Sequence, residues 1–174
     1  MKKNIALLSL LVFISFGFTA IKGEEWAKLE TGDYSIEYPS TWALDQSGQM
    51  GTSFFVMSEL DSKKDKFREN VNLLVQDLTG YNMDLDKYSE LSAEQVKTMI
   101  KNSKLIENQR IKSASGQYQK VIYLGDEGDF HLQFEQYYWV VNNKAYVLTL
   151  TCEKKNFKKY KKTGERILDS FKLK

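Results

Sequence analysis

Two runs of β-branched and aromatic residues, 130–141 and 144–152, lie on either side of Asn142-Asn143. Asparagine tolerates the positive φ of a tight turn, so this pattern predicts a long antiparallel hairpin. A two-residue loop fixes the register. The expected cross-strand pairs are Val141 with Lys144, Trp139 with Tyr146, Tyr137 with Leu148, and Glu135 with Leu150.

The second face of this hairpin is also apolar near the turn. It carries Phe134, Tyr138, Val140, Ala145 and Val147. A sheet that is apolar on both faces must be covered on both, so the rest of the chain is expected to supply helices for each side.

The first predicted helix spans 85–103. Its apolar and small residues recur at helical spacing: Tyr88, Ser92, Val96, Met99 and Ile100. Ser92-Ala93-Glu94-Gln95 has the form of a capping box, which predicts a restart or kink near Leu91.

The second predicted helix follows Asn156, which is its expected N-cap. One apolar stripe runs along it, formed by Phe157, Tyr160, Gly164, Ile167, Leu168 and Phe171. Gly164 within the stripe predicts a close approach of the helix to the strands.

Shorter periodic segments predict further strands at 26–30, 34–38, 52–58, 70–77, 105–113 and 117–124. Pro39 is expected to end pairing of the second strand, with Trp42 packed inward. The charged run 61–69 is interpreted as a solvated surface loop, and 125–129 as a turn.

The N-terminus has the pattern of a secretory signal peptide. Lys2 and Lys3 precede an apolar run from Ile5 to Ala20, after which polarity returns. We expect residues 1–23 to be removed and 24–174 to form a single domain that is exported to the periplasm or the extracellular space. The alternative is an uncleaved anchor, although the run is short for a membrane span. Cys152 is the only cysteine, so the cysteine of a lipoprotein signal is missing and no stable membrane anchor is expected after cleavage.

Loss of residues 1–23 reduces 25 basic residues to 22 against 23 acidic ones, and the formal charge falls from +2 to −1. This near balance argues against nucleic acid as a partner. Cys152 alternates with Leu148 and Leu150 along its strand, which favours a buried structural thiol.

The sequence contains no recognisable catalytic, cofactor-binding or metal-binding motif. His131 is the only histidine, so a multi-histidine metal site is excluded, and no nucleophile elbow, phosphate loop or dinucleotide fingerprint occurs. We interpret His131 as an ordinary, partly exposed residue. Asp126, Glu127 and Asp129 could meet a Ca²⁺ ion but lack EF-hand spacing, and a solvated loop is favoured. We therefore predict no catalytic, cofactor-binding or metal-binding residues, while paired carboxylates remain open.

The outer face of the last predicted helix is strongly basic. Nine basic residues lie between Lys154 and Lys174, against Glu165 and Asp169. Five of them form a candidate partner-binding patch, named here the basic face: Lys158, Lys159, Lys161, Lys162 and Arg166. Its partner could be an acidic protein, anionic lipid or glycan, and the alternative is a solubilising surface.

Four motifs together resemble the PsbP-like family. They are residues 34–39 (YSIEYP) followed by Trp42, residues 69–72 (ENVN), the turn region 140–146 (VVNNKAY), and residues 167–171 (ILDSF). The resemblance implies an α+β fold, an α/β/α sandwich with a central, mostly antiparallel sheet and flanking helices. It also implies a history of binding proteins without chemistry. The family offers no shared catalytic set, and the metal-contacting features of its photosynthetic members are not recognisable here.

These observations lead to a functional hypothesis with two alternatives. The chain is expected to be an exported, non-enzymatic protein-binding or accessory domain of the bacterial cell envelope, with an envelope or secreted protein as partner. The first alternative is a carrier of a small apolar ligand, held between sheet and helix by Tyr137, Trp139 and Tyr146. The second is a hydrolase that uses two facing carboxylates.

Overall fold

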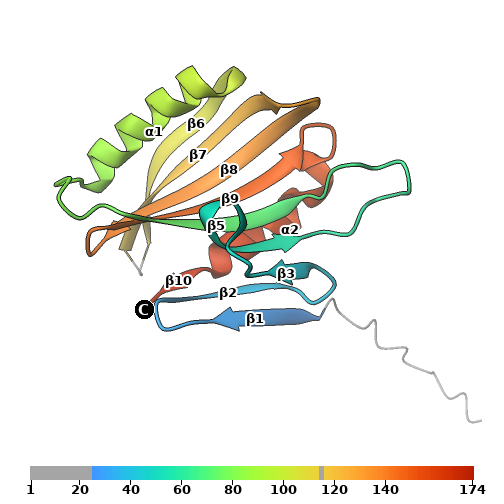
Figure 1. Cartoon of the computed structure of the whole chain (residues 1–174), viewed down its shortest axis with the longest axis horizontal. Coiled ribbons are helices and arrows are strands. Elements are labelled where there is room, and N and C mark those ends of the chain that lie inside the picture. Colours follow the sequence, from blue (N-terminus) through green and yellow to red (C-terminus); the bar gives the residue numbers. More distant parts are fainter. Residues whose placement is uncertain (1–24, 114–115) are drawn as a thin grey trace, which may run out of the picture.

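The computed structural model describes residues 25–113 and 116–174, and the predicted signal peptide lies outside these ranges. The described part folds into two antiparallel sheets and two α-helices (Figure 1). Neither helix has the length and hydropathy needed to cross a bilayer.

The larger sheet has seven strands, in the order β3-β4-β5-β9-β8-β7-β6. Their bounds are β3 Ala43–Asp45, β4 Thr52–Met57, β5 Asn70–Asp77, β6 Lys101–Ser113, β7 Gly116–Glu127, β8 Phe130–Val141 and β9 Lys144–Glu153. A short 3-10 helix, Gln49–Gly51, precedes β4.

The predicted central hairpin is confirmed as β8 and β9. Asn142 and Asn143 have φ values of 51° and 57°, so both turn residues use the conformation that asparagine tolerates. All four predicted cross-strand pairs are present, from Val141 with Lys144 to Glu135 with Leu150. This hairpin forms the middle of the larger sheet.

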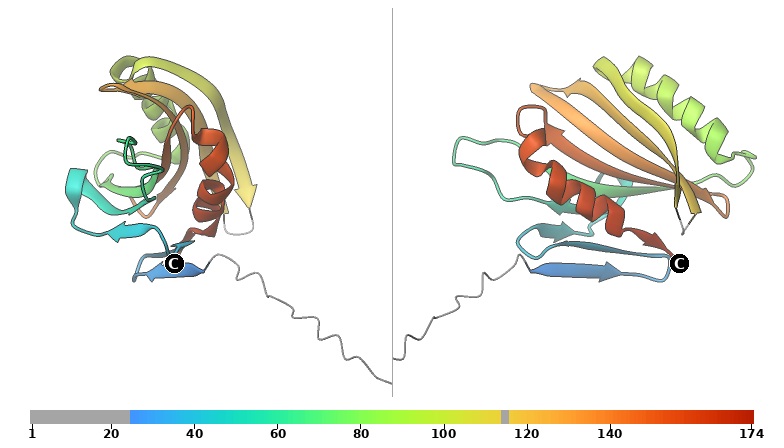
Figure 2. Two further views of the ribbon diagram at one scale, coloured as in Figure 1. Left: turned by 90° about the vertical axis from the view of Figure 1, so that its right-hand side faces the viewer. Right: turned by 180° about the vertical axis from the view of Figure 1, so that it is seen from behind.

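A helix covers each face of the larger sheet, as the two apolar faces of the hairpin predicted (Figure 2). Helix α1, Leu85–Met99, lies on one face, here named the α1 face, where it packs on Tyr138, Ala145 and Val147. Helix α2, Phe157–Ser170, lies on the opposite α2 face, over Leu148 and Leu150. The predicted α+β sandwich with flanking helices is thus confirmed.

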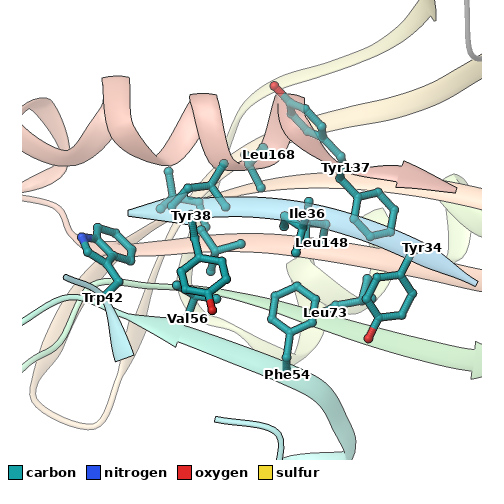
Figure 3. Close-up of a cluster of buried hydrophobic side chains, with 14 of the residues drawn as sticks. Tyr34, Ile36, Tyr38, Trp42, Phe54, Val56, Leu73, Tyr137, Leu148 and Leu168 are labelled. Atoms are coloured by element: carbon teal, nitrogen blue, oxygen red, sulfur yellow. The ribbon is translucent and has the colours of Figure 1, made fainter. Parts of the chain in front are cut away.

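A three-stranded sheet, in the order β1-β2-β10, completes the layer on the α2 face. Its bounds are β1 Trp26–Glu30, β2 Tyr34–Pro39 and β10 Lys172–Leu173. Tyr34, Ile36 and Tyr38 of β2 point into the core between α2 and the larger sheet, and Trp42 is buried as predicted (Figure 3). The sequence did not predict this separate sheet or β10.

Gly164 lets α2 lie directly on the sheet. A Cβ atom at this position would stand 2.4 Å from Cδ2 of Leu150, so the predicted close approach is confirmed. The N-cap of this helix differs from the prediction in how its side chain is used. Asn156 occupies the N-cap position, but its side chain donates to Glu69 and Glu153 rather than capping the helix.

Helix α1 ends four residues before its predicted end, and it runs unbroken through Leu91, so the predicted kink is wrong. Asp84 is the true N-cap, since its carboxylate accepts from the backbone N–H of Lys87 at 2.9 Å. Ser92 therefore lies inside the helix, where a capping box has no free N–H groups to satisfy.

Two loop predictions also need correction. Strands β6 and β7 are longer than expected, and β7 runs to Glu127, so the turn contains only Gly128 and Asp129. In the charged loop 61–69, Glu69 is fully buried and Asp61 contacts α2, so these two side chains are not simply solvated.

Candidate binding site

The basic face is exposed on α2, but intramolecular contacts engage three of its five side chains. Nζ of Lys159 lies 2.5 Å from Oδ1 of Asp61, Lys161 pairs with Glu165, and the Arg166 guanidinium lies 3.7 Å from the ring centroid of Trp26. Within the described ranges, no ion pair involves Lys158 or Lys162. The basic face therefore presents less free charge than its sequence indicates.

The three aromatic residues proposed for an apolar carrier site lie on the α2 face, where packing fills most of the space. Tyr137 and Tyr146 are buried in the core, and Trp139 packs on Phe171 with ring centroids 5.0 Å apart. A recess of about 240 Å³ remains beside Tyr137 and Trp139, and Tyr146 does not line it.

A larger hollow lies on the opposite side of the sheet. It is an open groove of about 650 Å³ on the α1 face, beside the part that α1 covers, and we name it the α1-face groove. Its lining comes from β4, β5, β7, β8, β9, the short 3-10 helix, the loop before β5 and the turn between β7 and β8. These residues are Met50, Thr52, Phe55, Phe67, Asn70, Asn72, Leu74, Tyr123, Glu127, Gly128, Phe130, Phe134, Gln136, Val147, Thr149 and Thr151.

Strand alternation brings polar side chains to the bottom of this groove. In β5, Val71 and Leu73 face the α2 core, so Asn70 and Asn72 face the groove. In β9, Leu148 and Leu150 likewise face α2. Thr149 and Thr151 therefore face the groove.

Strand register then places these side chains next to one another. Thr149 lies opposite Asn72 on one side and Gln136 on the other, and Thr151 lies opposite Asn70. We name this set of residues the polar floor: Asn70, Asn72, Gln136, Thr149 and Thr151.

Hydrogen bonds fix the orientation of the polar floor. Nε2 of Gln136 donates to Oγ1 of Thr149 at 3.0 Å, and the Tyr138 hydroxyl donates to Oε1 of Gln136 at 2.6 Å. Nδ2 of Asn72 donates to Oδ1 of Asn70 at 3.3 Å. The amide groups are thus held in place before any ligand arrives.

Aromatic rings form the walls. Tyr123 and Phe134 stack with centroids 4.7 Å apart, and Phe67 from the loop meets Phe130 at 5.1 Å. Phe55 of β4 lies opposite Asn72 in the strand register. These five rings, Phe55, Phe67, Tyr123, Phe130 and Phe134, are named the aromatic walls.

Helix α1 does not cover the groove. Next to the groove, under α1, the packing between helix and sheet leaves a second hollow. This smaller hollow of about 250 Å³ lies under the second half of α1 and shares Leu74, Tyr123, Gln136 and Val147 with the groove. At this end of the helix, Met99 is 76% exposed.

The lining of the groove is nearly uncharged. Glu127 is the one charged residue among the described residues that line it. No serine, cysteine, histidine or lysine is present among the described residues of this lining. An arrangement of amides, hydroxyls and aromatic rings is suited to holding a ligand.

The titratable residues singled out in the sequence lie elsewhere. His131 is exposed, and its Nδ1 lies 2.5 Å from Oδ1 of Asp126. Hydrogen bonds from Asn102 and His131 lower the pKa of Asp126. Cys152 is buried as predicted, and its burial raises the pKa of the thiol. In the described ranges, no three metal-ligating side chains cluster at Asp126, Glu127 and Asp129 or elsewhere.

Sequence comparison settles the family. The family model described as PsbP-like protein matches residues 21–173. The chain belongs to the PsbP-like family. The resemblance inferred from its motifs is thus confirmed, and no match is found among curated proteins.

Solved structures share the fold of this PsbP-like chain at low sequence identity. CyanoP, the cyanobacterial PsbP of Synechocystis sp. PCC 6803, is 13% identical with a TM-score of 0.60, covering 92% of this chain and 98% of its own. LpqN of Mycobacterium tuberculosis, described as involved in cell envelope biogenesis, is 11% identical with a TM-score of 0.64, covering 87% and 91%. PA94 of Pseudomonas aeruginosa is 13% identical with a TM-score of 0.58, covering 83% and 94%.

Proposed function

We propose that this PsbP-like protein is an exported, non-enzymatic binding protein of the bacterial envelope and that its ligand lies in the α1-face groove. Export is supported by the signal-peptide pattern of residues 1–23. The envelope assignment agrees with the description of LpqN, whose fold is similar.

The polar floor is the observation that carries this proposal. On the α2 face, Leu148, Leu150 and Cys152 of β9 are covered by packed side chains. On the α1 face, the same strand changes from Ala145 and Val147, under α1, to threonines beyond it. Along β9, the side chains under α1 and α2 are thus apolar, and Thr149 and Thr151 line the groove. This division is expected of a surface that receives a ligand.

The groove is proposed here in place of the two candidate binding surfaces that the sequence offered. Two charges of the basic face are paired with Asp61 and Glu165, and the Arg166 guanidinium lies over the ring of Trp26. The space under α2 is largely filled by the protein's own core. A carrier role is retained in altered form, since the groove lies on the other face of the sheet and has a polar floor.

An NMR screen tests the proposal without assuming a ligand class. A library of small fragments, including sugars, short peptides, nucleotides and fatty acids, is added to isotope-labelled residues 24–174, and shifted amide signals are mapped. We expect the shifts to cluster at the polar floor and the aromatic walls. Clustering on α2, or no reproducible cluster, would contradict the proposal.

A further inference from the structure

We propose that the ligand of the α1-face groove is an uncharged oligosaccharide. This inference rests on the proposed binding function and adds the chemical class of the ligand.

The polar floor matches the hydrogen bonding of sugar hydroxyls. An amide group offers both donors and an acceptor, and a threonine hydroxyl can do both at once. A sugar hydroxyl also donates and accepts, so it can bond to either side of an amide or threonine. The bonds from Gln136 to Thr149 and from Asn72 to Asn70 hold these groups in a row across β8, β9 and β5. Such fixed groups reduce the entropy lost on binding.

The aromatic walls match the other surface of a sugar. A pyranose ring has a face of C–H bonds, and the negative face of an aromatic ring attracts the weakly positive hydrogens of such a surface. Tyr123, Phe134 and Phe130 line one side of the groove, while Phe55 and Phe67 belong to β4 and the loop before β5. Tyr123 and Phe134 are buried, whereas Phe55, Phe67 and Phe130 are partly exposed. A sugar would therefore stack on these three rings while it contacts the amides.

The lining disfavours two other ligand classes. Among the described residues of the groove there is no Lys, Arg or His, so a phosphate or carboxylate would meet no cation and would face Glu127. A fatty acyl chain on the floor would desolvate Asn72, Gln136 and Thr149 without returning hydrogen bonds to them. The volume of about 650 Å³ lies within the usual range of small-ligand sites.

The test is an NMR titration of residues 24–174 with maltotriose, cellotriose and chitotriose. The anionic trigalacturonate and an uncharged tripeptide serve as comparison ligands. We expect saturable shifts at the polar floor with at least one neutral trisaccharide, and none there with trigalacturonate. The paired variant Asn72→Leu/Thr149→Val, which removes hydrogen-bonding groups and keeps the number of side-chain heavy atoms, should weaken that sugar at least tenfold. Phe55→Ala should also weaken it.

Lys162→Glu on α2 is the matched control and should leave the sugar affinity unchanged. If none of the three sugars shifts the groove signals at 10 mM while the tripeptide or another fragment does, the saccharide inference is overturned and the binding function stands. If no compound of any class shifts them, both fail. Unchanged sugar affinity in the paired floor variant would also overturn the inference.

Discussion

Lys120 is the cation that faces the buried carboxylate of Glu135 and two partly exposed carboxylates. Its Nζ lies 2.9 Å from Oε1 of Glu135, 3.8 Å from Glu165 and 4.0 Å from Glu107. Glu135 is fully buried, and burial raises the pKa of its carboxyl despite the bond from Lys120. Burial alone would lower the pKa of Lys120, but the carboxylates outweigh it and the pKa is raised. The charges of Lys120 and Glu135 therefore stabilise each other in the interior.

Lys120→Met should destabilise the protein by about 3–5 kcal/mol near neutral pH, because Glu135 would remain as a buried charge without its cation. The loss of stability in this variant should become smaller toward pH 4, because Glu135 can take up a proton there. Adding Glu135→Leu should recover much of the stability. Urea unfolding of the parent and the two variants measures this, and a Lys120→Met variant within about 0.5 kcal/mol of the parent would contradict it.

Glu69 presents a buried carboxylate without a cation. Oε1 accepts from Nδ2 of Asn156 at 3.0 Å, while Oε2 has no hydrogen-bond partner among the described residues. Burial raises the pKa of this carboxyl. The folded state thus holds the proton more tightly than the unfolded state, and stability falls as pH rises from about 4.5 through the folded pKa.

Glu69→Gln should remove this loss, since an amide keeps the acceptor for Asn156 and carries no charge. We expect the variant to match the parent near pH 4 and to exceed its stability by about 1–2 kcal/mol at pH 8, the scale of one unsatisfied buried group. Thermal unfolding of the variant and the parent at both pH values tests the sign of this stability difference. A variant less stable than the parent at pH 8 would show that the carboxylate stabilises the fold.

At the scale of elements, the contact between α2 and β9 is set by Gly164. Gly164→Ala should gain about 1 kcal/mol of helix propensity. The new Cβ would stand 2.4 Å and 2.7 Å from the two Cδ atoms of Leu150, and overpacking costs about 1–3 kcal/mol. We expect net destabilisation, measured by denaturant unfolding. Lys162→Ala, on the exposed side of the same helix, should change the free energy of unfolding little.

A double-mutant cycle separates the clash from other effects. Leu150→Ala alone should cost about 2–5 kcal/mol because it opens a cavity. In the Leu150→Ala background, Gly164→Ala should become neutral or stabilising, which gives a favourable coupling between the two changes. Additive effects would mean that Leu150 does not limit the approach of the helix.

Elements with strong local signals were predictable. Asn142 and Asn143 fixed the turn of the central hairpin, and the stripe from Phe157 to Phe171 fixed the buried face of α2. The end of α1 could not be predicted, because the helical pattern continues through Met99 and Ile100 although β6 begins at Lys101. Strand pairing over long separations gives no local signal, so the separate sheet formed by β1, β2 and β10 was missed.

At the scale of the whole molecule, the α1-face groove exists because β5 pairs with β9. Asn72 and Thr149 are far apart in sequence, and only this pairing places them side by side. A partial signal was present: Asn70 and Asn72 alternate with Val71 and Leu73, which marks one face of β5 as polar. Period two thus identified a polar face, but it could not show that threonines and a glutamine from two other strands would extend it.

The most direct test of the account compares fragment binding by two surface variants of residues 24–174. Asn72→Leu/Thr149→Val alters the polar floor, and Lys158→Glu/Lys162→Glu alters the basic face without removing the pairs of Lys159 and Lys161. The same fragment library is screened by NMR against both and against the parent. We predict that the floor variant loses most of the fragments bound by the parent, while the basic-face variant keeps them. Loss in the basic-face variant with retention in the floor variant would contradict the assignment of the groove as the binding site.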